Sequence, residues 1–265
     1  MNKTFSLAAT AASLLAVLAV APAFAQSSIP QENEAAARRT AQEAQTKALI
    51  EAERTRPRIA GYWRVDHKID TLTTADGKTP PLNAAGRTLY RQRTAANRAG
   101  KSDDPMLECL PPGTPRSLLV DEPFMIAQAP VKVTFFFQVH HVIRHIWLDG
   151  PLQMNEDERE NLWEGRSSGR WEGDTLIIET GDFNGKQWLD ASGLPQSPDM
   201  RVTERIRKVD ANTLENLITY QDAKYYSSPW TARLVFKAQP ASTILIEEDC
   251  AEKLLEFPLK EYAPQ

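Results

Sequence analysis

The chain has 265 residues, of which 42% are hydrophobic and 25% are charged, the composition of an ordinary globular protein. This composition excludes collagen-like, Gln/Asn-rich and wholly disordered chains, and the length is sufficient to bury a large core. The formal net charge is −4, and no dense basic cluster supplies the basic face of a duplex-binding domain, so we expect no nucleic-acid partner.

The first 25 residues have the pattern of a secretory signal peptide. Lys3 precedes an apolar run from Phe5 to Val20, and Ala23-Phe24-Ala25 forms a small-x-small cleavage site. The alternative is a membrane anchor, which is disfavoured because the run is short for a span. We expect cleavage after Ala25 and a periplasmic mature chain without a transmembrane segment.

Export changes how the two cysteines are interpreted. In an oxidising compartment, Cys109 and Cys250 predict a single disulfide, whereas two buried free thiols are the alternative. Two cysteines are too few for a tetrahedral thiolate zinc site.

Residues 26–57 form a polar helical segment. Gln31 to Arg54 is rich in Ala, Glu, Gln and Arg, with helix-favouring pairs at Glu34/Arg38 and Glu43/Lys47, and Pro57 ends it. Residues 58–265 then form a single β-rich domain. Two helices are expected there, at Ala84–Asn97 and Asn155–Trp163.

The rest of the domain is predicted to be almost entirely β. About eight strands at hairpin spacing favour an antiparallel meander closed into a barrel, or a sandwich. A first strand is expected at Ile59–Val65, and the eight that follow it are Val131–Val139, His141–Leu148, Gly169–Glu172, Thr175–Thr180, Arg201–Val209, Leu214–Gln221, Trp230–Lys237 and Thr243–Glu248.

Several motifs occur in a fixed order between Asp104 and Cys250. Cys109–Arg116 reads C-L-P-P-G-T-P-R, His141–Gly150 reads H-V-I-R-H-I-W-L-D-G, and Gly169–Leu176 reads G-R-W-E-G-D-T-L. This set resembles a large, uncharacterised family of exported bacterial proteins. The resemblance implies a β-rich, lipocalin-like barrel and assigns no catalytic residue. The chain departs from that family's pattern at Gln138, where a carboxylate is common, and at Arg166, where His is common.

His141 and Arg144 are the candidate catalytic pair. Histidine exchanges a proton near neutral pH, and arginine stabilises a carboxylate or an oxyanion. A regular strand places them on opposite faces, and a bulge near His140-His141 would bring them together. We expect His141 to share a cavity with Arg144, Trp188 or Tyr226. The predicted inward-facing set is Phe135, Phe137, Val139, His141, Ile143, His145 and Trp147.

Aromatic residues and one further histidine are the candidate ligand contacts. Aromatic side chains in a barrel usually form core, and a subset can line a binding site. The predicted ligand-binding residues are His145, Trp147, Trp188, Tyr226 and Trp230. His141 and His145 without a clear third ligand are a weak metal signal, so no metal is expected. No Gly-rich phosphate loop, Cys-x-x-Cys or haem motif occurs, so no cofactor is expected.

Two further patterns resemble catalytic motifs but are explained without catalysis. Gly165–Gly169 matches the nucleophile-elbow string, but a strand follows it and no histidine occurs after His145, which excludes an α/β-hydrolase. A serine nucleophile in another fold stays open. The carboxylates Glu172 and Asp174 flank a hairpin turn, where acidic residues are usually solvated.

The first functional hypothesis is a periplasmic barrel that binds a small, partly apolar molecule, such as an aromatic, steroid-like or lipid compound. The second is a cofactor-free lyase, isomerase or hydrolase on the same barrel, using His141 and Arg144. The third is a structural envelope protein that uses the polar N-terminal helix.

Overall fold

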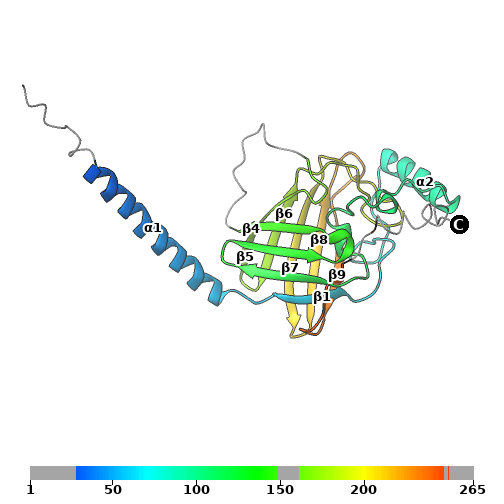
Figure 1. The fold of residues 1–265 in the computed structure, drawn as a ribbon. Helices are drawn as coiled ribbons and strands as arrows, with labels where there is room; N and C mark the ends of the chain where they lie inside the picture. Colours follow the sequence, from blue (N-terminus) through cyan, green and yellow to red (C-terminus); the bar gives the residue numbers. More distant parts are fainter. Residues whose placement is uncertain (1–27, 149–160, 248–249, 251–265) are drawn as a thin grey trace, which may run out of the picture. The chain divides into compact units, whose positions relative to one another are not determined.

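The computed structural model describes residues 28–148, 161–247 and 250, and it contains a closed barrel of nine strands (Figure 1). Neighbours in sequence are neighbours in the barrel, and β1 pairs with β9 to close it. All pairings are antiparallel except that of β4 with β5. The predicted mainly β barrel is therefore confirmed. The strands are β1 (Gly61–Val65), β2 (Phe124–Ala129), β3 (Lys132–Phe137), β4 (Ile143–Leu148), β5 (Arg166–Glu172), β6 (Thr175–Gly181), β7 (Arg201–Asp210), β8 (Thr213–Gln221) and β9 (Trp230–Ala238).

The polar helix predicted before the barrel is present as α1 (Ser28–Thr55). The side chains of residues 34–48 are all exposed, and Arg38 forms an i,i+4 salt bridge of 2.6 Å with Glu34. The chain divides into two compact units, residues 1–48 and 49–265. No described helix is long and apolar enough to cross a membrane. The predicted signal peptide and its cleavage site after Ala25 lie outside the described residues.

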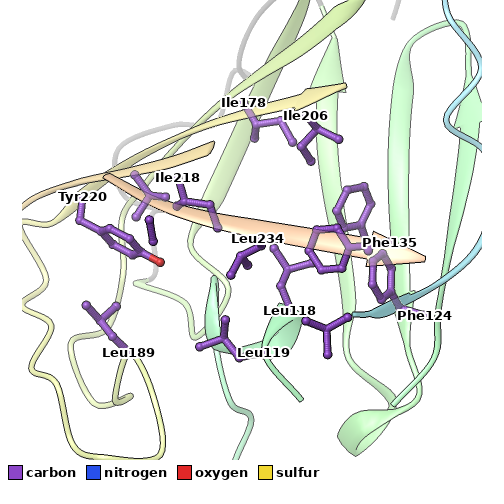
Figure 2. Packing of buried hydrophobic residues seen from close by; sticks show 14 of the residues in the cluster. Leu118, Leu119, Phe124, Phe135, Ile178, Leu189, Ile206, Ile218, Tyr220 and Leu234 are labelled. Atoms are coloured by element: carbon purple, nitrogen blue, oxygen red, sulfur yellow. The ribbon is translucent and has the colours of Figure 1, made fainter. Parts of the chain in front are cut away.

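The middle of the barrel is filled by apolar side chains. Alternation along each strand turns one face inward, and the inward residues are mostly branched or aromatic. Figure 2 shows Phe124, Phe135 and Leu234 among these buried side chains, and the ring centroids of Phe124 and Phe135 lie 6.0 Å apart. Leu118 and Leu119 enter from the loop before β2, and both are buried. Each fully buried side chain of this size contributes about 1.5–3 kcal/mol.

Two segments outside the strands are attached to the barrel. Asp104 accepts two hydrogen bonds from the Arg116 guanidinium, of 2.6 and 2.5 Å, and both side chains are buried. This pair fixes the segment that carries Leu118. The second segment is α2 (Ala84–Arg98), which begins at the N-cap Asn83 and packs so closely that a Cβ on Gly86 would clash with the Tyr225 carbonyl oxygen.

The structure corrects the strand assignment at both ends of the meander. Thr243–Glu248 was predicted as a strand, but residues 243–247 form none, and Ile244 is 77% exposed. The β1–β9 pairing already closes the sheet, so no edge is left for a further strand. The short β2 was not predicted. Most of the predicted helix Asn155–Trp163 lies outside the described residues.

The connection between β3 and β4 changes the phase of the alternation. His140 and His141 have left-handed φ angles of 49° and 51°, and they form a short 3₁₀ turn with Val139. Before this turn Phe135 and Phe137 face inward, as predicted. After it the inward residues are Arg144, Ile146 and Leu148, so the predicted inward orientation of Ile143, His145 and Trp147 is wrong.

The predicted disulfide is present. Cys109 and Cys250 are bonded across a sequence separation of 141 residues, with their Cα atoms 5.6 Å apart. The bond closes a loop that contains β2 to β9, whereas β1 precedes it in the chain. Such a long loop loses much conformational entropy in the unfolded chain when it is cross-linked.

We therefore expect reduction of Cys109–Cys250 to lower the free energy of unfolding by up to about 5 kcal/mol, the chain-entropy value for a loop of this length. Urea unfolding with and without a thiol reductant measures the change. The Cys109→Ser/Cys250→Ser double variant is the control and should not respond to reductant. Equal stability of the oxidised and reduced protein would contradict the prediction.

Candidate functional site

A described hollow opens in the barrel wall over β4 to β7, and its lining combines outward-facing residues with the buried Arg144, Ser167 and Thr180. Its volume is about 590 Å³, and we call it the wall groove. The strand registers place its outward-facing residues in two parallel rows. The first row is Trp147, Ser168, Glu179 and Thr203, and the second is His145, Arg166, Gly181 and Arg201.

The size of side chains along these rows explains the hollow. Ser168 lies between Trp147 and Glu179 in the first row, and Gly181 lies between Arg166 and Arg201 in the second, so each row has a small residue between large ones. A continuous outer face with large residues at every position would leave no depression. Side chains alternate between the two faces of a strand, so the strand registers decide which residues face outward. The groove forms because some of these outward-facing residues are small.

The strand pairing between β4 and β5 is incomplete along one border of the groove. β4 pairs with β5 only from Ile146 to Leu148, so the first half of β4 has no β5 partner. The chain before β5 turns toward β6 instead, where the Leu162 amide donates to the Asp182 carbonyl at 2.9 Å. Gly165 has a φ of +65°, and a Cβ there would lie 2.5 Å from the Gly181 carbonyl oxygen. Leu162 and Gly165 therefore form the rim.

His145 and Trp147 form the β4 side of the groove. Their ring centroids are 6.4 Å apart, and the Lys132 ammonium lies 5.1 Å from the Trp147 ring. The His145 Nδ1 is 3.2 Å from the Thr134 hydroxyl oxygen. Burial and the neighbouring Lys132 charge lower the pKa of His145, so its imidazole is neutral at pH 7. The groove-lining side chains on this side, His145 and Trp147, are therefore aromatic and neutral, and the Lys132 charge lies next to them.

A buried ion pair lies on the inner face, directly beneath the groove. The Arg144 guanidinium spans the interior from β4 and donates to the Glu204 carboxylate on β7. It also donates to the Ser167 hydroxyl at 3.1 Å and the Thr180 hydroxyl at 2.9 Å. The Asn216 amide donates to the other Glu204 oxygen at 2.9 Å. The Arg144 and Glu204 side chains are 1% and 0% exposed.

Three polar atoms of this network make no hydrogen bond with any described residue. They are Arg144 Nη1, Asn216 Oδ1 and the Tyr220 hydroxyl, all buried. Figure 2 shows the Tyr220 hydroxyl directed into the barrel. Burial and the nearby Glu204 and Asp190 charges raise the pKa of Tyr220 well above its ordinary value, so it stays a neutral donor. Buried polar atoms of this kind are usually satisfied by water or by a ligand.

Glu164 connects the groove to the segment that carries Leu118. Its carboxyl group accepts hydrogen bonds from the Thr114 hydroxyl at 2.5 Å and the Ser117 hydroxyl at 3.0 Å. Burial raises the pKa of Glu164, and these hydrogen bonds and the Arg144 charge only partly offset the effect. Glu164 therefore holds its proton to a higher pH than an exposed glutamate does.

The structure does not bring the predicted catalytic pair together. Arg144 belongs to the buried network, whereas His141 is exposed and does not line the wall groove. At His140-His141 the chain forms a left-handed 3₁₀ turn between β3 and β4 instead of a bulge within a strand, and Arg144 faces inward after it while His141 stays exposed. A joint catalytic role for this pair stays a prediction.

The predicted ligand contacts fall into two groups. His145 and Trp147 line the groove, whereas the other three are core residues at one end of the barrel. Trp230 stacks on Tyr220 at 4.2 Å, the Tyr226 hydroxyl donates to the Pro195 carbonyl at 2.9 Å, and the Arg93 guanidinium lies 4.8 Å from the Trp188 ring. Their contact with a ligand stays a prediction. Sequence reasoning did not select Glu164, Glu204, Asn216 or Arg201.

Neither a family model nor a curated protein matches the chain. Among solved structures, a SAHS (abundant heat soluble) protein from Ramazzottius varieornatus is similar, with a TM-score of 0.34 and 11% identity over 70% of this chain and 98% of that chain. A mutant of the fluorescent protein UnaG gives a TM-score of 0.32 and 11% identity over 69% and 96%. These scores carry no functional argument, and the family resemblance drawn from the motifs stays a prediction.

The buried pair generates a stability prediction. Glu204→Gln leaves the Arg144 charge uncompensated in the interior, so it should lower the free energy of unfolding by about 3–5 kcal/mol. The double variant Arg144→Met/Glu204→Gln removes the charge and should recover part of that loss. Urea unfolding of the four proteins in a double-mutant cycle measures the coupling. Additive effects of the two substitutions would show that the pair is not coupled.

Glu164 generates a pH prediction. Its pKa is raised in the folded state, so its protonated form favours folding below the ordinary pKa, and that contribution is lost as pH rises through the folded pKa. Glu164→Gln cannot ionise. The variant should therefore gain stability relative to the wild type when both are moved from acidic to neutral pH. Urea unfolding at the two pH values checks this, and a pH-independent difference would refute it.

Proposed function

We propose that the wall groove binds a small, partly apolar molecule with a flat aromatic or steroid-like body. The observation that carries the proposal is the hollow of about 590 Å³ over β4 to β7, within the range of about 300–1,000 Å³ of small-molecule sites. Trp147 offers a flat aromatic wall, and Ile143, which is 51% exposed, adds apolar surface beside it. Hydroxyl and charged groups on the other strands would fix the orientation of the ligand.

The proposed site is on the wall rather than in the barrel interior. Large side chains such as Phe124, Phe135 and Leu234 fill the described interior, and each is buried. The outer face instead offers small residues in the middle of two rows. A ligand there would bury apolar surface without displacing core side chains, whose removal costs several kcal/mol each.

We further propose that the protein is exported to the periplasm. Residues 1–25 have the signal-peptide pattern, and the Cys109–Cys250 disulfide supports the proposal because such bonds persist mainly in oxidising compartments.

The neutral fluorophore N-phenyl-1-naphthylamine is a suitable probe, because its fluorescence rises in apolar sites. Trp147→Ala should weaken its binding by about tenfold, the loss expected for one aromatic contact of ~1.4 kcal/mol. Ser168→Phe should block binding by filling the groove floor, whereas Ser168→Ala should not. Fluorescence titration measures the dissociation constants.

Tyr62→Ala is the matched control, because Tyr62 is a half-buried aromatic residue on β1 that does not line the groove. Thermal unfolding of every variant verifies that it is folded. Unchanged probe affinity in both Trp147→Ala and Ser168→Phe would reject the groove as the binding site.

A further inference from the structure

The second row of the groove carries two arginines on either side of a glycine. Arg166 pairs with Gly181 across β5 and β6, and Arg201 follows Gly181 on β7 one step beyond the Thr180–Val202 pair. Gly181 has no side chain to separate them. A Cβ built on Gly181 would lie only 3.0 Å from Arg201 Cζ, so the Arg201 guanidinium covers the glycine. The row therefore places the Arg201 guanidinium over Gly181, with Arg166 on the neighbouring strand.

The charge of Arg201 is not balanced by a neighbouring acid. No described carboxylate lies within 4.0 Å of its guanidinium, and its one hydrogen bond is a long one, 3.5 Å, to the adjacent Met200 carbonyl oxygen. Arg166, by contrast, has an acidic neighbour, because its Nε lies 3.8 Å from the Asp182 carboxylate. Glu179 accepts a 2.9 Å hydrogen bond from Arg170, which lies outside the groove.

The carboxylates Asp182 and Glu179 also line the groove, and each lies within 4.0 Å of an arginine other than Arg201. Burial keeps the pKa of Glu164 high, which reduces the ionised fraction of this carboxyl. The Arg144 charge beneath the floor is matched by Glu204. Arg201 is thus the cation of the groove that a bound anion would neutralise, and because the side chain is exposed, added salt should screen this attraction.

We propose that the ligand of the wall groove is an organic anion whose acidic group binds Arg201 over Gly181, while its apolar body lies against Trp147. The inference rests on the proposed function and adds the ligand's charge. Guanidinium groups bind carboxylate or sulfonate oxygens in bidentate geometry. Trp147 is on β4 and Arg201 is on β7, three strand spacings of about 4.8 Å apart. A body of two or three rings spans that width.

Two matched probes test the charge. 1-Anilinonaphthalene-8-sulfonate has the ring system of N-phenyl-1-naphthylamine plus one sulfonate. The anionic probe should bind more tightly by about tenfold, the effect of one charge-assisted hydrogen bond of ~1.4 kcal/mol. Arg201→Gln should remove this advantage and leave the neutral probe unaffected. The advantage should also shrink as salt is added.

Arg205→Gln is the matched control, because Arg205 is an exposed outer-face arginine of β7 that does not line the groove. It should leave both affinities unchanged. Equal binding of the two probes, or equal effects of Arg201→Gln and Arg205→Gln, would overturn the anion inference while the proposed binding function stands. If neither probe depends on Trp147, the proposed function fails and the inference fails with it.

Discussion

The buried Arg144–Glu204 pair is the constraint on which the candidate site depends. A guanidinium inside a barrel is costly unless a carboxylate and further hydrogen bonds compensate it. Glu204 supplies the charge, and the Ser167 and Thr180 hydroxyls accept two of the remaining N–H groups. Four strands, β4 to β7, must therefore keep fixed heights relative to one another, because one slipped register would remove a partner from the interior.

The same constraint determines the outer face. When Ser167 and Thr180 face inward, their neighbours in sequence must face outward, and these neighbours include Arg166, Ser168 and Gly181. The same strand register therefore determines both the groove on the outside of the wall and the ion pair on its inside. A substitution that perturbs the buried pair is expected to disturb the groove above it, so ligand binding and stability of this wall are linked.

The alternation of apolar and polar residues in the sequence was sufficient to predict most strands of the barrel. Arg201–Val209 and Leu214–Gln221 alternate cleanly, and β7 and β8 follow them closely. The phase of β4 was not predictable, because two non-glycine residues, His140 and His141, adopt left-handed φ angles without any glycine to signal the turn. Nor does the local sequence reveal that β4 and β5 run parallel, since that depends on the path of the chain between them.

The candidate site was only partly predictable for a related reason. Arg144, His145 and Trp147 were selected by residue type, yet the register decides which of them face the groove. Glu204 did carry a usable signal: it is the single carboxylate between Val202 and Ile206 on the apolar face of its strand. A carboxylate there needs a buried partner. Its partner Arg144 is 60 residues away in sequence, and only the closed barrel brings the two together.

The outer face of β5 to β9 shows why Arg201 differs from its neighbours. Arg170, Arg205, Arg207 and Arg233 are each within 4.0 Å of Glu172, Glu179 or Glu215, so that cross-strand ion pairs cover this surface. Such pairs contribute little stability individually, but they neutralise charge. Among the described residues Arg201 is the exception on these strands, and it lies in the groove. An unpaired guanidinium beside a hollow, on a surface where the other arginines are paired, is the arrangement that an anionic ligand requires.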